Sequence, residues 1–118
     1  MDENIIGHLV LGPLMLVMSL IFKFFPPKKI NNLYGYRTTR SMKSQETWDM
    51  GNIYCFNLMV LASVATIFLQ SILILTLSKG NSMMISVLVM VSLLVGTIPL
   101  TERHLKKHFD DDGKRKVD

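Results

Sequence analysis

The residues best suited to chemistry lie between residues 26 and 51, where two arginines stand among aromatic and amide side chains. The guanidinium groups of Arg37 and Arg40 can each bind a phosphate or a carboxylate through two parallel hydrogen bonds. Tyr36 and Trp48 offer rings that suit a boundary between membrane and water, because one edge is apolar and the other is polar. Together with Asn52, these side chains predict a pocket for an anionic group at that boundary.

Other interpretations of the same residues stay open. The arginines and the aromatic rings can instead anchor the segment to anionic lipid and hold it against the following helix. Catalysis would rest only on Arg37, Arg40 and Asp49 near a lipid headgroup. The sequence contains no glycine-rich phosphate loop, no arrangement typical of a catalytic triad and no acidic pair within an apolar run. We therefore expect that the protein is not an enzyme and has no catalytic residues.

A metal site is weighed on His104 and His108, whose spacing of four residues can place two imidazoles on one helix face. Three basic side chains within residues 103–107 surround them, and cations repel a metal ion. We expect no metal site and no cofactor. Leu105 and Phe109 instead predict a helix that lies on the lipid surface after the last apolar segment.

The elements that position these residues follow from the uneven distribution of charge. Of 118 residues, 13 are Lys or Arg and 9 are Asp or Glu, yet none of these lies in residues 4–22, 50–78 or 80–101. About 20 apolar residues span a bilayer core, where only helices or closed barrels satisfy the backbone. We predict an all-α integral membrane protein with three transmembrane helices, at about 5–25, 53–77 and 83–100, in one membrane domain over residues 1–118.

Composition excludes two other classes of protein. A single cysteine rules out a disulfide scaffold, and a hydrophobic content of 49% rules out a disordered chain. The first apolar segment is expected to be a span and not a cleaved signal peptide. Such a signal opens with basic residues and closes on small ones, whereas Asp2 and Glu3 open this chain and Pro26 and Pro27 close the segment.

The basic residues predict the orientation in the membrane. Twelve of the 13 Lys and Arg residues lie in or beside residues 26–51 or after residue 101, and Lys79 alone lies on the other side. Cytoplasmic loops carry an excess of Lys and Arg. We therefore predict that the loop at 26–51 and the basic tail at 101–118 are cytoplasmic and that the N-terminus is outside. The net charge of +4 reflects this topology, so we expect no direct binding of nucleic acid.

The loop at 26–51 is predicted to be ordered. Its proline pair ends the first helix, because proline lacks the backbone amide that a helix needs. Ser44 is placed as the N-cap of the second helix, which then begins near Gln45, about two turns before the apolar run.

Three further residues of the loop region have predicted positions. Trp48 and Asn52 are four residues apart, so they share one face of the second helix. Gly35 lies between two tyrosines and suits a turn with positive φ.

Read as one segment, residues 27–52 resemble the SdpI family of small bacterial membrane proteins. The family pattern runs Pro, Asn, Tyr-Gly-Tyr-Arg-Thr, Ser, Trp and Asn. It is matched here by Pro27, Asn31, Tyr34, Gly35, Tyr36, Arg37, Thr38, Ser41, Trp48 and Asn52. All of these after Pro27, together with Arg40, form the set that we predict to bind a ligand or partner.

The resemblance implies a protein of the bacterial inner membrane with a role in immunity and signalling. The namesake of the family protects its cell from a secreted toxin and holds a transcriptional repressor at the membrane. It is longer, with additional N-terminal spans, and the present chain resembles the shorter, single-module members. The implied partners are the lipid bilayer and a toxin peptide or a cytoplasmic regulator. The alternative is a binder or small transporter of an anionic lipid or metabolite that uses an Arg37 pocket.

Three spans bury little surface per chain, so we expect a homo-oligomer formed through the second or third span. Arg37 is the residue on which we would place ligand binding, because it follows Gly35 in a loop that is fixed at both ends.

Overall fold

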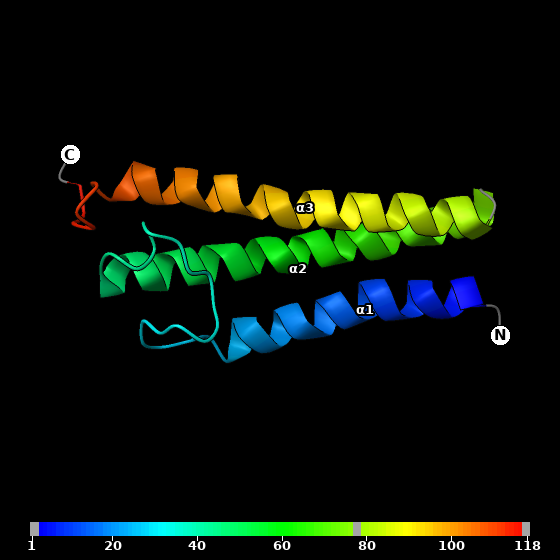
Figure 1. Ribbon diagram of the computed structural model, residues 1–118, viewed down its shortest axis with the longest axis horizontal. Coiled ribbons are helices and arrows are strands. Elements are labelled where there is room, and N and C mark those ends of the chain that lie inside the picture. The colour runs from blue at the N-terminus through cyan, green and yellow to red at the C-terminus, as the bar shows by residue number, and fades with distance from the viewer. Residues whose placement is uncertain (1–2, 77–78, 117–118) are drawn as a thin grey trace.

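The computed structural model describes residues 3–76 and 79–116 and folds them into three long helices. These are α1 (Glu3–Phe24), α2 (Gln45–Thr76) and α3 (Lys79–His108), arranged side by side in a molecule of 53 × 25 × 19 Å. Figure 1 shows that the loop between α1 and α2 lies at the same end as the C-terminal segment, and that the N-terminus lies at the other end. The helical fold class predicted from the charge-free runs is confirmed.

The helix bounds refine the predicted spans. α2 begins at Gln45, as the Ser44 cap predicts, and α3 begins at Lys79 and continues through Pro99 to His108. The predicted second and third spans leave residues 78–82 between them as a connection, but residues 79–82 already belong to α3. Residues 77 and 78 lie outside the described residues. Residues 79–82 are helical because a helix keeps their backbone hydrogen-bonded up to the edge of the apolar run.

Within the part of the chain that the structure describes, two helices are long and apolar enough to cross a membrane. They are Gln45–Leu73 of α2 and Met83–His108 of α3, while the described apolar part of α1, Val10–Phe24, is shorter. Large apolar side chains point outward on these helices: Leu61, Phe68 and Leu75 are 66%, 70% and 85% exposed. An outward apolar surface of this kind suits lipid as the surrounding solvent.

The interior of the bundle is lined by small hydroxyl side chains. Ser19, Ser63 and Thr66 are fully buried, and each donates its hydroxyl to the carbonyl four residues earlier in its own helix. The hydroxyls of Ser19 and Ser63 also lie 3.3 Å apart and join α1 to α2. Small residues allow helix backbones to approach closely, which is how helices associate in lipid.

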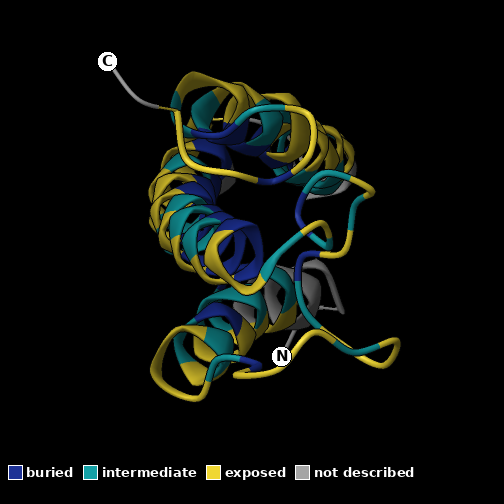
Figure 2. Ribbon diagram, turned by 90° about the vertical axis from the view of Figure 1, so that its left-hand side faces the viewer, coloured by how far each residue is buried: buried dark blue, intermediate teal, exposed yellow. Residues whose placement is uncertain are grey.

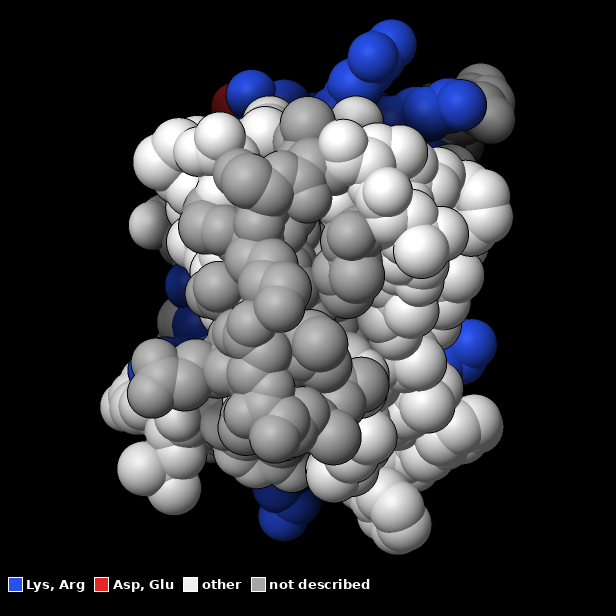
Figure 3. All heavy atoms as spheres, turned by 90° about the vertical axis from the view of Figure 1, so that its right-hand side faces the viewer, with Lys and Arg blue, Asp and Glu red and all other residues white. Residues whose placement is uncertain are grey.

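α2 is the central helix. It packs along both α1 and α3, whereas α1 and α3 contact each other least, as the end view in Figure 2 shows. Gly12 marks the close approach of α1 to α2, because a Cβ there would lie 2.5 Å from Gln70 Oε1 and 2.7 Å from Ile67 Cγ1. Seen from the end away from the loop, Lys and Arg atoms appear only around the outline of the molecule (Figure 3).

Candidate functional site

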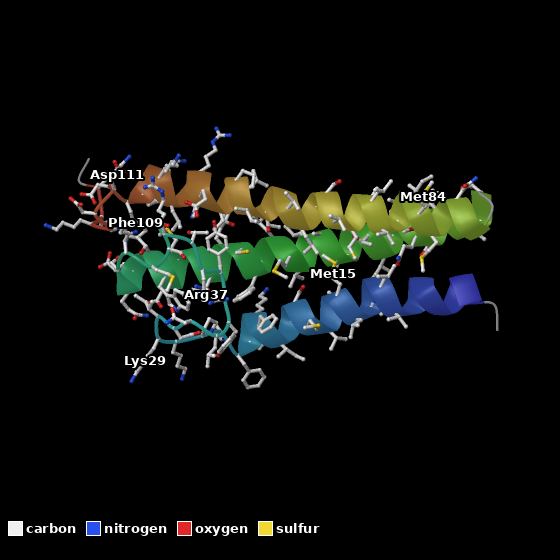
Figure 4. All side chains as sticks on the ribbon, viewed as in Figure 1. Met15, Lys29, Arg37, Met84, Phe109 and Asp111 are labelled. Atoms are coloured by element: carbon white, nitrogen blue, oxygen red, sulfur yellow. The ribbon has the colours of Figure 1, made fainter. Side chains whose placement is uncertain are left out.

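A buried cluster of polar and aromatic side chains lies where the loop crosses the start of α2. We call it the motif cluster and define it as Tyr36, Ser41, Thr47, Trp48 and Asn52, each buried. It occupies the end of the bundle at which the charged side chains gather, near the labelled Arg37, Phe109 and Asp111 in Figure 4.

Trp48 and Asn52 lie on one face of α2, as their spacing predicts, and both fix the loop. The indole Nε1 of Trp48, which is 0% exposed, donates to the carbonyl of Pro27 at 2.7 Å. The amide oxygen of Asn52 accepts the backbone amide of Tyr36 at 2.7 Å, and its Nδ2 donates to the carbonyl of Trp48 at 2.8 Å. These bonds attach both ends of residues 27–36 to the same face of α2.

Gly35 has the positive φ that the sequence predicts, 112°. A Cβ at this position would lie 2.7 Å from Asn52 Oδ1 and 2.7 Å from Pro27 Cγ. Both the backbone conformation and the lack of space therefore require glycine where the loop crosses α2.

Ser41 and Thr47 close the second half of the loop. The hydroxyl of Ser41 accepts the amide of Thr38 at 2.8 Å and lies 3.0 Å from the carbonyl of Tyr36, to which it can donate. The hydroxyl of Thr47 lies 3.0 Å from the carbonyl of Ser41. The oxygen of Ser44 accepts the amide of Thr47 at 3.1 Å, which confirms the predicted N-cap.

Tyr36 connects the loop to the end of α3. Its hydroxyl donates to Glu102 Oε1 at 2.5 Å, and the other carboxylate oxygen, Oε2, lies 3.4 Å from Nε of Arg40. Burial is the main cause that raises the pKa of Tyr36 well above the usual range of a tyrosine, and the hydrogen bond to Glu102 raises it further. Tyr36 is therefore a neutral donor, and Glu102 is the acceptor that holds both Tyr36 and Arg40.

The C-terminal segment folds back onto this assembly as a short hairpin, residues 109–116. Phe109 and Arg115 form its antiparallel bridge, and the guanidinium of Arg115 lies 6.0 Å from the centre of the Phe109 ring. The hydroxyl of Ser44 donates to the carbonyl of Gly113 at 2.8 Å, so the cap of α2 also fixes the hairpin. Gly113 has φ 81°, and a Cβ there would lie 2.7 Å from that of Lys43.

The predicted site residues separate into two groups. Asn31, Tyr34 and Arg37 belong to a more exposed part of the loop, where Asn31 Oδ1 accepts the amide of Tyr34 and Arg37 donates to the carbonyl of Asn32. The ring of Tyr34 lies 6.0 Å from that of Phe22 at the end of α1. Arg37 is exposed and is not part of the buried motif cluster.

An open cavity of about 640 Å³ adjoins the motif cluster, between the turn at 38–43, the end of α3 and the hairpin. Of the predicted site residues, only Thr38 and Arg40 line it. Trp48 and Asn52 lie beneath the loop and hold it, in contrast to the expectation that they line the pocket themselves. Arg37, which lies three residues before Arg40 in the chain, does not line this cavity. Its side chain is exposed to solvent.

Sequence reasoning missed the contributions of Glu102 and Asp111. One signal was available, since Glu102 is the first charged residue after the apolar run at 80–101 and stands among basic residues.

The two histidines considered for a metal site contact each other and an aromatic ring. His104 stacks on Tyr54 with 4.0 Å between the ring centres, and the ring of His108 lies edge-on to that of His104 at 4.7 Å. Among the side chains that the structure describes, no three of His, Cys, Asp or Glu lie together as metal ligands would.

Comparison with known proteins identifies relatives of this chain. The family model of the SdpI/YfhL protein family matches residues 28–101, which include the loop, α2 and most of α3. The chain is 37% identical over 98 residues to a Bacillus subtilis (strain 168) protein named YfhL and described as uncharacterized. This match covers 83% of the present chain and 84% of the relative. No solved structure matches the chain significantly.

Proposed function

The chain belongs to the SdpI/YfhL protein family of membrane proteins, and we propose that it is a non-enzymatic immunity and signalling protein that captures a membrane-active toxin peptide in the bilayer. In this proposal α1 is a third span, the protein lies in the bacterial inner membrane, and the loop and the basic tail face the cytoplasm. The shared position of the loop and the C-terminal segment at one end of the bundle supports this topology.

The observation that carries the proposal is an apolar groove of about 300 Å³ between α1 and α3, which we call the methionine groove. Its lining includes Met15, Met18, Phe22, Met59, Met90 and Leu94. The groove forms because α1 and α3 contact each other least, and it lies within the apolar segments, so its occupant must itself be apolar. Flexible methionine side chains adapt to an apolar helix, as they do on other surfaces that bind peptides.

The groove is connected to the loop between α1 and α2 through a stack of aromatic rings. Phe22 lines the groove, and its ring lies 5.4 Å from that of Phe56 in α2 and 6.0 Å from that of Tyr34 in the loop. A peptide in the groove would contact Phe22 directly and so change the position of the exposed end of the loop. This connection supports a signalling role, in which a cytoplasmic regulator contacts the loop.

A binding role also suits the motif cluster better than a catalytic one. Trp48, Asn52 and Ser41 use their polar groups to bond loop backbone, and they are buried and do not line the cavity. Such side chains hold a surface in a fixed shape and leave it to other groups to contact a partner.

Filling the methionine groove tests the proposal. Sensitive bacterial cells that make the chain are challenged with membrane-active peptides, and survival is measured at matched expression. We expect protection by the native chain and its loss in Leu94→Trp, because the larger ring occupies the groove. Leu93→Trp is the matched control, since Leu93 is adjacent and exposed and does not line the groove.

Equal protection by both tryptophan variants would contradict peptide capture in the groove. A native chain that protects against no such peptide, although it is correctly inserted, would contradict the immunity role itself.

A further inference from the structure

Arg40 has one edge of its guanidinium fixed by the protein. Its Nε lies 3.4 Å from Glu102 Oε2, and the other oxygen of that carboxylate accepts the hydroxyl of the buried Tyr36. The side chain of Arg40 is 20% exposed, so it is largely enclosed by the loop and α3. Its orientation is therefore set before any ligand arrives, which reduces the entropy lost on binding.

The other edge of the guanidinium is poorly satisfied. Nη1 and Nη2 of Arg40 both lie 3.3 Å from a single oxygen of Asp111, whose side chain is 95% exposed. Charge-assisted hydrogen bonds of this type are shorter when well made, about 2.7–2.9 Å, and two parallel bonds to two oxygens are preferred. The Asp111 carboxylate thus occupies an anion position without filling it well.

The surroundings of this position favour an anion. Lys43 and Lys106 line the same cavity as Arg40, together with the carboxylates of Glu102 and Asp111. When the exposed Asp111 moves aside, three cationic groups face the cavity and only the Glu102 carboxylate opposes them. Thr38 and Thr39, which are uncharged, also line the cavity.

The cavity also reaches the apolar surface. Ile98, which is 48% exposed, lines it one turn before Glu102, where α3 leaves its apolar run. An anion bound beside Arg40 therefore has lipid-facing surface within reach. This arrangement suits an anionic group that is attached to an apolar chain.

We propose that the cavity at Arg40 binds a phosphate group, with the phosphate of an anionic lipid headgroup as its source, and that this phosphate displaces Asp111. A phosphate offers the two oxygens that the free edge of the guanidinium requires. Displacement removes one of the contacts by which the hairpin is held, so the bound headgroup and the hairpin compete for Arg40.

The test measures binding by the full chain and uses two variants with opposite expected signs. The chain is extracted from phosphatidylcholine vesicles that contain phosphatidylglycerol, and the retained phosphatidylglycerol is measured by native mass spectrometry. Arg40→Gln should lower the affinity about 10- to 100-fold, as expected for the loss of hydrogen bonds to a charged group. Asp111→Asn should raise it about two- to fivefold, because it removes an exposed competing carboxylate.

Asp112→Asn is the matched control. It removes the same charge from the neighbouring exposed position, which does not line the cavity. We expect Asp112→Asn to bind phosphatidylglycerol like the native chain. An equal increase in both Asn variants would reduce the effect to general electrostatics and would overturn the proposal.

A second arm separates the two sources of phosphate. Inorganic phosphate is titrated into the Asp111→Asn chain in a neutral detergent and followed by calorimetry. Retention of phosphatidylglycerol that exceeds phosphate binding supports the lipid source, whereas Arg40-dependent binding of inorganic phosphate without lipid retention supports a phosphate site for a soluble ligand. Binding of neither probe overturns the site, and this result is independent of the protection assay for the methionine groove.

Discussion

The loop end of this molecule and its helical bundle are held together by different forces. At the loop end, hydrogen bonds join segments that are far apart in the sequence, as between Tyr36 and Glu102 or between Ser44 and Gly113. Along the bundle, the buried hydroxyls of Ser63 and Thr66 bond to their own helix, and close packing of small residues joins the helices. The structure of the loop end therefore depends on directional hydrogen bonds, and that of the bundle depends on close packing.

This difference predicts where single substitutions are costly. A directional bond between buried groups leaves an unpaired partner when one side is removed, which costs about 1–3 kcal/mol. Removing a contact between small residues in lipid costs less free energy, because the surrounding lipid is as apolar as the surface that is replaced. Three substitutions test this comparison, in order of decreasing effect.

Trp48→Ala should have the largest effect on stability. Trp48 is fully buried and its Nε1 bonds to Pro27, so we expect a loss of about 3–5 kcal/mol in the free energy of unfolding. Unfolding by titration with sodium dodecyl sulfate in mixed micelles, followed by circular dichroism, measures this. The control is Phe68→Ala on the outer face of α2, which is 70% exposed and should change stability by less than about 0.5 kcal/mol. Equal losses in both variants would remove the distinction between the two regions.

Tyr36→Phe should have an intermediate effect. It removes the donor to the Glu102 carboxylate and keeps the ring, so the expected loss is about 1.5–3 kcal/mol in the same unfolding measurement. In a Glu102→Gln background the phenol loses its charged acceptor, and the effect of Tyr36→Phe should fall to about 0.5–1.5 kcal/mol. An unchanged effect in that background would mean that the hydrogen bond is not the source of the stability.

Ser63→Ala should have the smallest effect, although Ser63 is as completely buried as Trp48. Its hydroxyl bonds mainly to the carbonyl of Met59, which keeps its helical partner, and the added contact to Ser19 is long at 3.3 Å. We expect a loss of about 0.6 kcal/mol, typical of polar contacts between membrane helices. A loss comparable to that of Trp48→Ala would show that the bundle, too, depends on directional bonds.

The sequence predicts the local features of both regions and misses the contacts that join them. The charge-free runs locate three helices, and short spacings correctly place Ser44, Gly35 and the shared face of Trp48 and Asn52. Which of Arg37 and Arg40 lines the cavity cannot be predicted in this way, because both are guanidinium groups in one loop. It depends on the path of the backbone and on Glu102, which lies 62 residues beyond Arg40 in the chain.

The contact between Ser44 and Gly113 also orders events during synthesis. The acceptor of the Tyr36 hydroxyl follows it by 66 residues and that of the Ser44 hydroxyl by 69. At a translation rate of about 5–20 residues per second, the loop waits roughly 3–14 s for these partners. During that interval the bonds of Trp48 and Asn52 to the loop can already form, whereas the hydroxyls of Tyr36 and Ser44 lack Glu102 and Gly113. The contacts that join the loop to α3 and to the hairpin can therefore form only after both have been synthesised.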